Sequence, residues 1–448
     1  MGPDKDAALA TDLYELTMAA AYFENKIEGQ ATFELFVRNY PKNRSFLIAA
    51  GLQQAVEYLH HVRFEEKHIE FLRRHPVFKD VSKDFFQYLK TFQFTGSVYA
   101  MQEGTVFFPN EPILQVTAPV IEAQIVETYL LSIINFETLI ASKAARVVGA
   151  ARGRDVVEFG ARRAHGPESA LLAARASYIG GCVGTSNVLA GYKFGIPTYG
   201  TVAHSFVMMF DTEREAFERF CKVFPSSPAF LLDTYDTLAA ARIVASMNVN
   251  PALVRLDSGN RALLSRKVRK ILNDAGMEDT KIFASGDLNE YVLDKITKQN
   301  APIDSFGVGT DLVTSRDDSA LPGIYKLVAI KQRGHTVLRA KTSAGKRTIP
   351  GTKQVYRRYN RQGMIVRDLI ALANETPPPR TKPLLTGVMR DGQLTITLPS
   401  LDRIREVRKN ELESLPQKYH RLRGSARPPV HFSRLLKRLT KSLWNDAK

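Results

Sequence analysis

His204 is the residue of this chain whose chemistry can be argued most directly. It follows the small residues 200–203 in PTYGTVAHS and precedes the apolar run SFVMMF. An unperturbed imidazole, with a pKa of about 6.5, is mostly uncharged at neutral pH and keeps a lone pair. Such a ring can be a general base, a metal ligand or a nucleophile toward phosphorus. A hydrogen-bonded structural histidine is the alternative, and the expected position at a strand end favours a functional role.

Two pairs of charged residues follow apolar runs in the same way. Arg162 and Arg163 come after Gly160 in VVEFGARR, and two guanidinium groups there suit a carboxylate or a phosphate. Arg255 and Asp257 alternate in VRLDSGN, so a strand would project both side chains in the same direction. A surface salt bridge and a purely structural ion pair are the alternatives for these two motifs.

Further polar residues end other apolar runs. Three carboxylates, Asp233, Asp236 and Asp287, could hold Mg²⁺ or a ribose diol, or each could cap the helix that follows it. In FGVGTDLV, Gly307 and Gly309 would let the backbone approach a phosphate, with Thr310 as a donor. Cations, glycine turns and carboxylates at one rim together indicate a phosphorylated sugar substrate.

These residues need a scaffold that brings several strand ends together. Between residues 155 and 310, six short apolar runs each end in small, polar or charged residues: VVEFGARR, PTYGTVAHS, FLLDTYD, VRLDSGN, IFASGD and FGVGTD. Continuous apolar runs are typical of buried parallel strands, whose carboxyl ends carry the active sites of barrel enzymes. The segments AFERFCKVF, TLAAARIVASM, ALLSRKVRKIL and LNEYVLDKIT have helical periodicity. An α/β barrel is favoured over a doubly wound sheet, because no GxGxxG fingerprint is present.

The rest of the chain predicts four regions. Residues 1–135 are expected to form an N-terminal α/β domain and residues 136–330 the α/β barrel. Residues 331–375 are expected to form a small C-terminal β element, with turns at Gly334 and Gly345. Residues 376–448 read as a proline-rich linker, ANETPPPRTKPLL, followed by a solvated basic tail. Within the tail, HFSRLLKRLTKSLW predicts an amphipathic helix. Docking on the protein's own surface is favoured, and contact with a membrane or RNA is the alternative.

Composition limits the function classes. The formal net charge is +16, and residues 401–448 contribute half of it, with 13 Lys and Arg against 5 Asp and Glu. Such a charge admits either a nucleic-acid surface or anionic small substrates. The two cysteines, Cys182 and Cys221, lack metal-ligand spacing and are expected to be free thiols. No signal peptide and no run of eighteen strongly apolar residues is evident, so we expect a cytoplasmic protein that does not enter a membrane.

Taken together, the motifs closely resemble the nicotinate phosphoribosyltransferase family from about Thr11 to Ile370. The resemblance rests on TDLYELTMAAAYF, FELFVRNYPKNRSFLIAAGLQQAVEYL, EFGARRAHGP, GTSNVLAG, PTYGTVAHSFV, DTYDT, RLDSGN, VGTDLVT, IYKLVAI and KRTIPGTKQVYR. It implies an incomplete α/β barrel with an N-terminal α/β domain. It also implies a homodimer with active sites at the subunit interface.

The implied reaction is the first step of NAD salvage from nicotinate. Nicotinate and 5-phosphoribosyl 1-diphosphate give nicotinate mononucleotide and diphosphate, with Mg²⁺ present and ATP hydrolysis coupled to turnover. By resemblance, His204 is transiently phosphorylated by ATP, and Tyr14 stacks on the pyridine ring from the neighbouring subunit. Nicotinate would be held by Arg162, Thr201, Ser186 and Arg255. The sugar diphosphate would be held by Asp257, Asp287, Gly307, Gly309 and Thr310, and Arg255 and Asp257 would take part in catalysis.

Two positions bear on the substrate. Ser186 in GTSNVLAG stands where nicotinamide-using relatives place an Asp, and an acid there would repel nicotinate. Asn260 in RLDSGN instead matches the nicotinamide branch, where the nicotinate family would have Asp. A nicotinamide phosphoribosyltransferase is therefore the near alternative, and substrate preference separates the two. A nucleic-acid-binding protein on an inactive barrel is the distant alternative. It predicts salt-sensitive binding that weakens when Arg434, Lys437 and Arg438 are removed.

Overall fold

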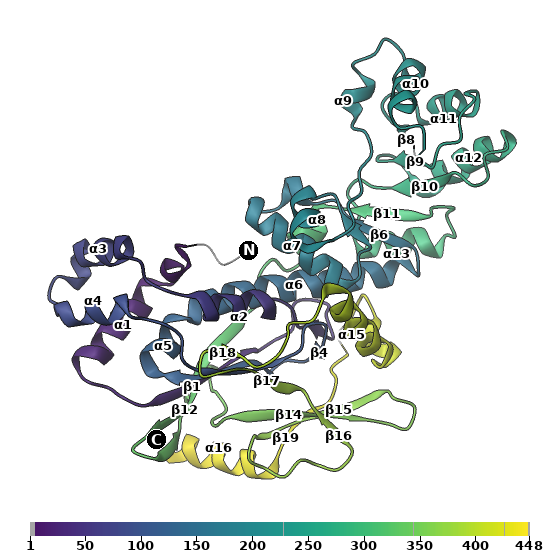
Figure 1. Cartoon of the computed structure of the whole chain (residues 1–448). Helices are drawn as coiled ribbons and strands as arrows, with labels where there is room; N and C mark the ends of the chain where they lie inside the picture. Colours follow the sequence, from purple (N-terminus) through teal and green to yellow (C-terminus); the bar gives the residue numbers. More distant parts are fainter. Residues whose placement is uncertain (1–4, 227, 344, 425, 447–448) are drawn as a thin grey trace. The chain divides into compact units, whose positions relative to one another are not determined.

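A computed structural model describes residues 5–226, 228–343, 345–424 and 426–446 of the chain. Two compact units are present (Figure 1). Unit 1 consists of Met1–Leu139 and Ala320–Lys448, and unit 2 of Ile140–Ser319. The first boundary falls within the long helix α6 (Glu127–Ala151).

The described part of unit 2 is built on one sheet of six parallel strands. Their order is β7-β6-β11-β10-β9-β8. The strands are β6 (Asp155–Glu158), β7 (Gly184–Thr185), β8 (Ala229–Leu231), β9 (Leu253–Leu256), β10 (Lys281–Ala284) and β11 (Ser305–Val308). The first strand, β6, pairs with the last, β11, and consecutive strands pair everywhere except between β7 and β8. A doubly wound sheet lacks this pairing of first and last strands, so the fold is an incomplete α/β barrel.

Helices connect these strands, as the periodicity predicts. Figure 1 shows α10 to α12 beside β8 to β10. The helices are α7 (Pro167–Gly180), α8 (Val188–Phe194), α9 (His204–Val207), α10 (Glu213–Val223), α11 (Thr237–Ala245), α12 (Arg261–Asp274), α13 (Glu290–Lys298) and α14 (Thr310–Val313), with the 3-10 turn η3 (Ala161–Arg163). The four predicted crossover helices correspond to α10, α11, α12 and α13 and are confirmed.

The prediction of one barrel strand is wrong. PTYGTVAHS forms no strand, and only Thr198 makes a single bridge, to Thr185. Pro197 has no N–H for a ladder, and residues 197–200 are exposed, so the burial that stabilises a parallel strand is missing. The second strand of the barrel is instead the two-residue β7. His204 therefore does not end a strand but begins the short helix α9.

Unit 1 contains a seven-stranded antiparallel sheet ordered β13-β12-β1-β5-β3-β17-β18. Its strands are β1 (Gln30–Val37), β3 (Ser97–Met101), β5 (Pro112–Pro119), β12 (Gly323–Gln332), β13 (His335–Leu338), β17 (Leu385–Arg390) and β18 (Gln393–Leu394). A second sheet, ordered β16-β14-β15-β19, is made of β14 (Lys353–Tyr359), β15 (Ile365–Leu372), β16 (Thr381–Pro383) and β19 (Val430–Phe432). Strands β2 (Leu47–Ile48) and β4 (Val106–Phe107) pair separately.

The helices of unit 1 pack around these sheets. They are α1 (Leu13–Glu24), α2 (Leu52–His61), α3 (Glu66–Arg74), α4 (Lys83–Lys90), α5 (Val120–Ile125), α15 (Leu401–Glu413) and α16 (Arg434–Asp446), with 3-10 turns η1 (Ala7–Leu9), η2 (Pro76–Phe78) and η4 (Gln417–His420). Among the described residues, none of the helices has both the length and the apolar character needed to cross a lipid bilayer.

The structure corrects the prediction of a separate C-terminal β element at residues 331–375. Strand β12 pairs with β1 along its length, so β12 and β13 extend the N-terminal sheet. Strands β14 and β15 join a different sheet. The physical reason is non-local pairing, because the backbone N–H and C=O groups along one edge of β1 find their partners only when β12, far away in the sequence, lies beside it.

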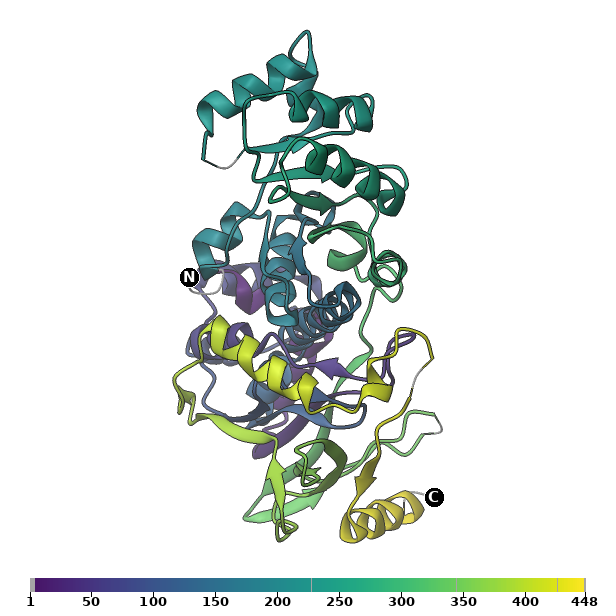
Figure 2. The same cartoon turned by 90° about the vertical axis from the view of Figure 1, so that its right-hand side faces the viewer.

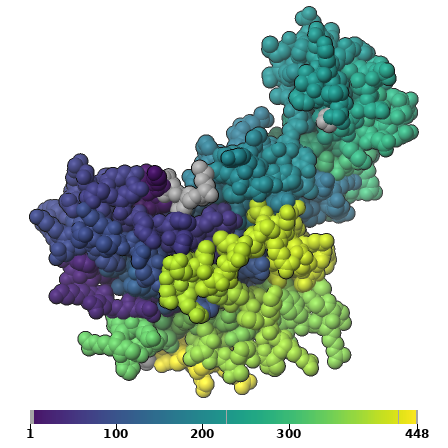
Figure 3. Space-filling model, viewed as in Figure 1, coloured from purple at the N-terminus to yellow at the C-terminus, as the bar shows by residue number. Residues whose placement is uncertain are grey.

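Residues 376–448 are likewise not a linker and a solvated tail. The proline-rich segment connects β15 to β16 within one sheet, and β19 pairs in parallel with β15. In the space-filling view, the yellow C-terminal residues lie against the rest of unit 1 (Figure 3). The predicted amphipathic helix is confirmed as α16, with Leu436 fully buried, and it lies beside the second sheet (Figure 2).

A buried ion-pair network attaches α15 to this sheet. Arg357 on β14 is fully buried and donates to both oxygens of Asp368, with Nη2–Oδ2 at 2.6 Å. Its Nη1 donates to Glu411 of α15 at 2.5 Å. Because leaving one such charge buried without its partner costs about 3–5 kcal/mol, this network explains why the basic C-terminal region is held in place.

Candidate active site

A cleft of about 520 Å³ opens at the carboxyl ends of the unit 2 strands. Segments that follow β6, β7, β9, β10 and β11 all contribute to it, as does the segment around residue 201. Most of the residues predicted from the sequence line it, namely Arg162, Ser186, Thr201, Arg255, Asp257, Asp287, Gly307, Gly309 and Thr310. Most of these residues directly follow strands of one sheet, which brings together side chains more than a hundred positions apart in the sequence.

Arg255 is the most firmly held cation in the cleft. Its Nε donates to Ser285 Oγ at 2.8 Å, Nη1 to Thr201 Oγ1 at 2.9 Å and Nη2 to Asp257 Oδ1 at 2.8 Å. The guanidinium also lies over the Phe159 ring, 5.7 Å from its centroid. These contacts leave one N–H on each terminal nitrogen for a ligand. The group is thus pre-oriented to grip a carboxylate with two parallel hydrogen bonds.

Asp257 remains ionised beside Arg255. Burial acts to raise the pKa of Asp257, but the Ser285 hydroxyl and the Arg255 guanidinium outweigh burial and lower it. His204 is also near enough to lower this pKa. Because the carboxylate already accepts from Ser285 and Arg255, its remaining acceptor capacity faces the cleft.

The loop after β10 is fixed by a second arginine. Arg261 donates to the carbonyl oxygens of Asp257, Ser285 and Gly286, and so ties the β9 and β10 loops together. Gly286 has φ +77°, and a Cβ there would overlap the Asp257 carbonyl oxygen. The next residue, Asp287, also has positive φ, at +48°. A glycine is therefore required where the two loops meet.

Three charged groups of the cleft are left for ligands. In the part of the chain that the structure describes, the side chains of Arg162, Arg163 and Asp287 form no hydrogen bond or ion pair. Arg162 and Arg163 lie in the exposed turn η3, and Asp287 is exposed. Free guanidinium groups suit an anionic ligand, and a free carboxylate suits a diol or a cation.

The glycines at the end of β11 have a packing role that the sequence did not predict. A Cβ at Gly307 would overlap the rings of Phe159 and Phe283, and one at Gly309 would press on the Phe159 backbone. Thr310 begins α14, and its carbonyl accepts from Thr314 Oγ1 at 2.7 Å.

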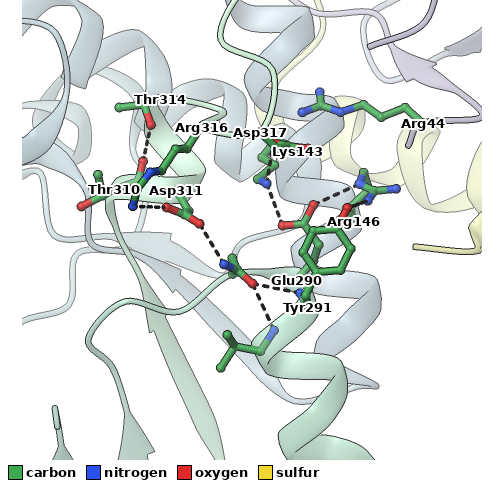
Figure 4. A network of polar contacts seen from close by, with 12 residues as sticks. Arg44, Lys143, Arg146, Glu290, Tyr291, Thr310, Asp311, Thr314, Arg316 and Asp317 are labelled. Atoms are coloured by element: carbon green, nitrogen blue, oxygen red, sulfur yellow. Dashed lines mark hydrogen bonds and ion pairs between the residues drawn. The ribbon is translucent and has the colours of Figure 1, made fainter. Parts of the chain in front are cut away.

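A polar network lies behind this loop (Figure 4). Asp311 accepts from Asn289 Nδ2 at 2.9 Å and pairs with Arg316 at 3.5 Å. The neighbouring Glu290 is buried and binds Lys143 at 2.7 Å and Arg146 at 3.2 Å. These contacts connect the β11 loop to the start of α13 and hold both segments in place.

His204 lies near the cleft rather than among the residues that line it; its neighbour Ala203 does line it. Its ring is 42% exposed, and Nε2 lies 3.4 Å from Oδ1 of the buried Asp233. Asp233 Oδ2 accepts from Ser258 Oγ at 2.5 Å. A carboxylate facing Nε2 favours the proton on that nitrogen and leaves the Nδ1 lone pair available. Asp233 thus lies beside His204 and is not among the residues that line the cleft.

Tyr14 belongs to unit 1, so unit 2 builds the cleft without it. It lies on α1 and is 47% exposed. Burial, together with the carboxylates of Glu127, Glu15 and Asp12, raises the pKa of Tyr14 above its usual value, so the phenol stays neutral. Its role in ring stacking stays a prediction.

Asn260 has a local structural role. It is the N-cap of α12, and its side-chain oxygen accepts from Leu263 N at 3.1 Å. Asp would cap the helix equally well, because either side chain offers the same acceptor. The difference between Asn and Asp at this position therefore says little about which substrate binds.

Phe159 and Ser285 are cleft residues that were not predicted from the sequence. Phe159 is the only aromatic residue among those that line the cleft in the described structure, and Ser285 is the buried hydroxyl that bonds both Arg255 and Asp257. Each lies beside a motif already recognised, in EFGARR and ASGD. Their position at a strand end was the available signal.

The residues present fit a magnesium ion bound together with a substrate. The described residues contain no cluster of three or more His, Cys, Asp or Glu side chains arranged for a metal. Mg²⁺ is commonly bound through one or two carboxylates plus substrate phosphates, and Asp287 offers such a free carboxylate.

Comparison with known proteins covers almost the whole chain. The N-terminal domain of nicotinate phosphoribosyltransferase matches residues 9–135, and its C-terminal domain matches residues 378–440. The C-terminal domain of quinolinate phosphoribosyl transferase matches residues 140–318.

Individual relatives are nicotinate phosphoribosyltransferases as well. A nicotinate phosphoribosyltransferase of Mycobacterium tuberculosis is 45% identical over 416 residues, covering 91% of this chain and 88% of that protein. One of Bacillus subtilis is 42% identical, covering 83% and 77%. The crystal structure of human nicotinic acid phosphoribosyltransferase matches with a TM-score of 0.86 and 30% identity, covering 97% of this chain and 99% of that chain.

Proposed function

Because the chain belongs to the nicotinate phosphoribosyltransferase family, we propose that its unit 2 cleft joins nicotinate to 5-phosphoribosyl 1-diphosphate. The products are nicotinate mononucleotide and diphosphate, and the reaction opens NAD salvage from nicotinate. The observation that carries the proposal is Arg255, held by Ser285, Thr201 and Asp257 with two N–H groups that these contacts do not use.

The cleft suits a planar anion beside a sugar. The Arg255 fork binds the nicotinate carboxylate, Arg162 adds a second cation, and Phe159 supplies a flat apolar wall for the ring. Ser186 adds a neutral hydroxyl, which does not repel a carboxylate as an acid would. The pyridine nitrogen is itself the nucleophile, so the protein needs to move no proton. Its contribution is positioning, and electrostatic stabilisation of an oxocarbenium-like sugar.

The sugar diphosphate occupies the other side of the cleft in this proposal. The backbone of Gly307 and Gly309, with the Thr310 hydroxyl, binds phosphate, while Asp257 and Asp287 face the ribose and its counter-ion. When bound through Asp287 and the diphosphate, Mg²⁺ would neutralise the leaving group.

ATP coupling through His204 is part of the proposal. The Asp233 carboxylate beside Nε2 leaves Nδ1 as the nucleophile toward the γ-phosphate of ATP, and that transfer would release ADP. Hydrolysis of the phosphohistidine would then return the neutral ring. The 42% exposure of the ring leaves room for the incoming phosphate.

The test of function is mononucleotide formation from 5-phosphoribosyl 1-diphosphate with nicotinate and with nicotinamide, each with and without ATP. We expect product from nicotinate only, at a higher rate with ATP and with release of ADP. A preference for nicotinamide would favour the other branch of the family. Absence of product with both bases would reject the proposed activity.

We predict that His204→Ala keeps basal transfer but loses ATP stimulation, because the ring is not among the residues that line the cleft proposed for nicotinate. Rates with and without ATP, and acid-labile ³²P on the protein, are the measurements. Asp233→Asn should weaken the stimulation in the same direction, since it removes the charge that orients the ring. Full ATP coupling in His204→Ala would rule out the phosphohistidine.

We further propose a homodimer with active sites at the subunit interface. Large apolar side chains of unit 2 are strongly exposed on α8 and just after α9, including Val188, Tyr192 (87%) and Met209 (80%). Such a surface is typical of one that a partner covers. A reducing, cytoplasmic location also belongs to the proposal and is supported by the free thiols of Cys182 and Cys221.

A heterodimer tests whether sites are shared. Tyr14→Ala and Arg255→Ala chains carrying different tags are co-expressed, and the mixed dimer is isolated by two affinity steps. If Tyr14 acts on the neighbouring subunit, one of the two sites contains neither change and about half of wild-type activity returns. If the mixed dimer is as inactive as its parents, Tyr14 acts within its own subunit. A Tyr14→Ala parent with full activity would show that Tyr14 has no role.

A further inference from the structure

Glu158 is a fully buried carboxylate at the end of β6, behind the cleft rather than in it. Its side chain joins two segments that supply cleft residues. One oxygen, Oε1, accepts from the backbone N–H of Gly160, at the start of the turn with Arg162. The other, Oε2, accepts from Thr185 Oγ1 at 2.5 Å, next to Ser186.

The backbone of Glu158 reinforces this connection. Its carbonyl oxygen accepts from Ser186 N at 2.9 Å, so Glu158 binds the Ser186 segment through both side chain and main chain. Thr185 Oγ1 in turn accepts from Asn187 N at 2.9 Å. Thr185 also exchanges backbone hydrogen bonds with Pro197 and Tyr199, in the segment that leads to Thr201. Three segments that line the cleft therefore depend on one carboxylate.

This connection matters because the sheet is weak at this edge. Strand β7 has only two residues, it pairs with β6 at two positions, and the barrel is open between β7 and β8. A short edge ladder fixes a strand poorly, so a side-chain bridge from the neighbouring strand adds positional restraint to the backbone hydrogen bonds.

Stability alone does not account for Glu158. No cation pairs with it among the described residues, and burial raises its pKa, which shows that the fold disfavours its charge. An apolar side chain at this place would avoid that cost. The burial of Glu158 is unfavourable, and its side chain joins segments of the cleft. Its role is therefore geometric.

We propose that Glu158 is a positioning residue that keeps Arg162 and Ser186 in a fixed arrangement, and thereby sets the preference for nicotinate over nicotinamide. This inference rests on the proposed function of the cleft. Arg162 attracts the carboxylate of nicotinate, and Ser186 lacks the acidic group that would accept hydrogen bonds from the amide of nicotinamide. Discrimination between the two bases therefore requires both side chains at a fixed separation.

The test compares Glu158→Ala, Glu158→Gln and Thr185→Val with the wild type. In Glu158→Ala we expect the KM for nicotinate to rise about tenfold or more and the ratio of kcat/KM for nicotinate over nicotinamide to fall, with a smaller change in kcat. Glu158→Gln should retain most of the preference, because its amide can accept from Gly160 and donate to Thr185. Thr185→Val, which removes a single hydroxyl, should lie between them.

Glu290→Gln is the matched control, because Glu290 is equally buried in unit 2 but bonds Lys143 and Arg146 (Figure 4). It should lower the unfolding temperature without changing the substrate ratio. The inference is overturned if Glu158→Ala changes the ratio no more than Glu290→Gln, or if Glu158→Gln is as impaired as Glu158→Ala. If Glu158→Ala does not fold, the inference is tested with Thr185→Val. An unchanged ratio of kcat/KM for nicotinate over nicotinamide in that variant rejects the inference. An inactive wild type would reject the proposed function instead.

Discussion

Arg255→Ala is expected to lose nicotinate binding by about a hundredfold, while the protein stays folded. Each charge-assisted hydrogen bond to a carboxylate contributes about 1.5–3 kcal/mol, so losing a two-bond grip costs at least ~3 kcal/mol. Removing Arg255 also leaves the Asp257 carboxylate without its cation, and this uncompensated negative charge adds repulsion toward nicotinate. The measurements are the KM for nicotinate and the calorimetric Kd, alongside thermal unfolding.

Arg269→Ala is the matched control for this change. Its side chain is 19% exposed, compared with 15% for Arg255, and it bonds the carbonyl oxygens of Glu278 and Thr280 near the amino ends of the strands. It should cost stability and leave the KM unchanged. Arg255→Lys keeps the charge but not the fork, so it should be intermediate. An unchanged nicotinate affinity in Arg255→Ala would remove this residue from the site.

Gly286→Ala is expected to lower kcat/KM by about a hundredfold or more, although Gly286 need not touch a substrate. A Cβ there would overlap the Asp257 carbonyl oxygen, so the loops after β9 and β10 must separate. Asp257 and Asp287 would move with them, and a displacement of about 1 Å near a reacting centre can cost about a hundredfold in rate. Steady-state kinetics and thermal unfolding together measure the effect.

Gly276→Ala separates backbone strain from the overlap. Gly276 has φ +72°, close to the +77° of Gly286, but a Cβ there would meet open space. Both variants place an alanine in the left-handed backbone region, which costs about 1–2 kcal/mol of stability. Only Gly286→Ala also displaces the cleft loops. We expect Gly276→Ala to lose some stability and to keep wild-type kinetics. Equal loss of activity in both would show that strain, rather than loop separation, is responsible.

Much of the site could be predicted from the sequence because its signals are local. Buried parallel strands are short apolar runs, and the polar residues directly after them lie at one edge of the sheet. This placed Arg162, Arg255, Asp257, Asp287 and Thr310 together, and the resemblance to a family was confirmed by relatives at 45% identity. The crossover helices followed from their periodicity for the same reason.

Other features depend on partners that are distant in sequence. Nothing within β12 indicates that it pairs with β1, and nothing in the basic C-terminal region indicates that Glu411 meets a buried Arg357. PTYGTVAHS has enough apolar residues for a strand. It forms none, because residues 197–200 are exposed and Pro197 has no N–H to donate to a ladder.

The roles of single residues also separate into those that depend on local sequence and those that depend on distant partners. The sequence by itself determined the family, the strand-end positions and the residue types available at the cleft. Only the tertiary structure decided that Asp233 faces His204, that Gly307 makes room for two phenylalanine rings, and that Glu158 joins the segments of Arg162 and Ser186. The physical reason is that propensity and periodicity act between neighbours in the chain, whereas a buried polar contact depends on which strands pair and where each side chain then points.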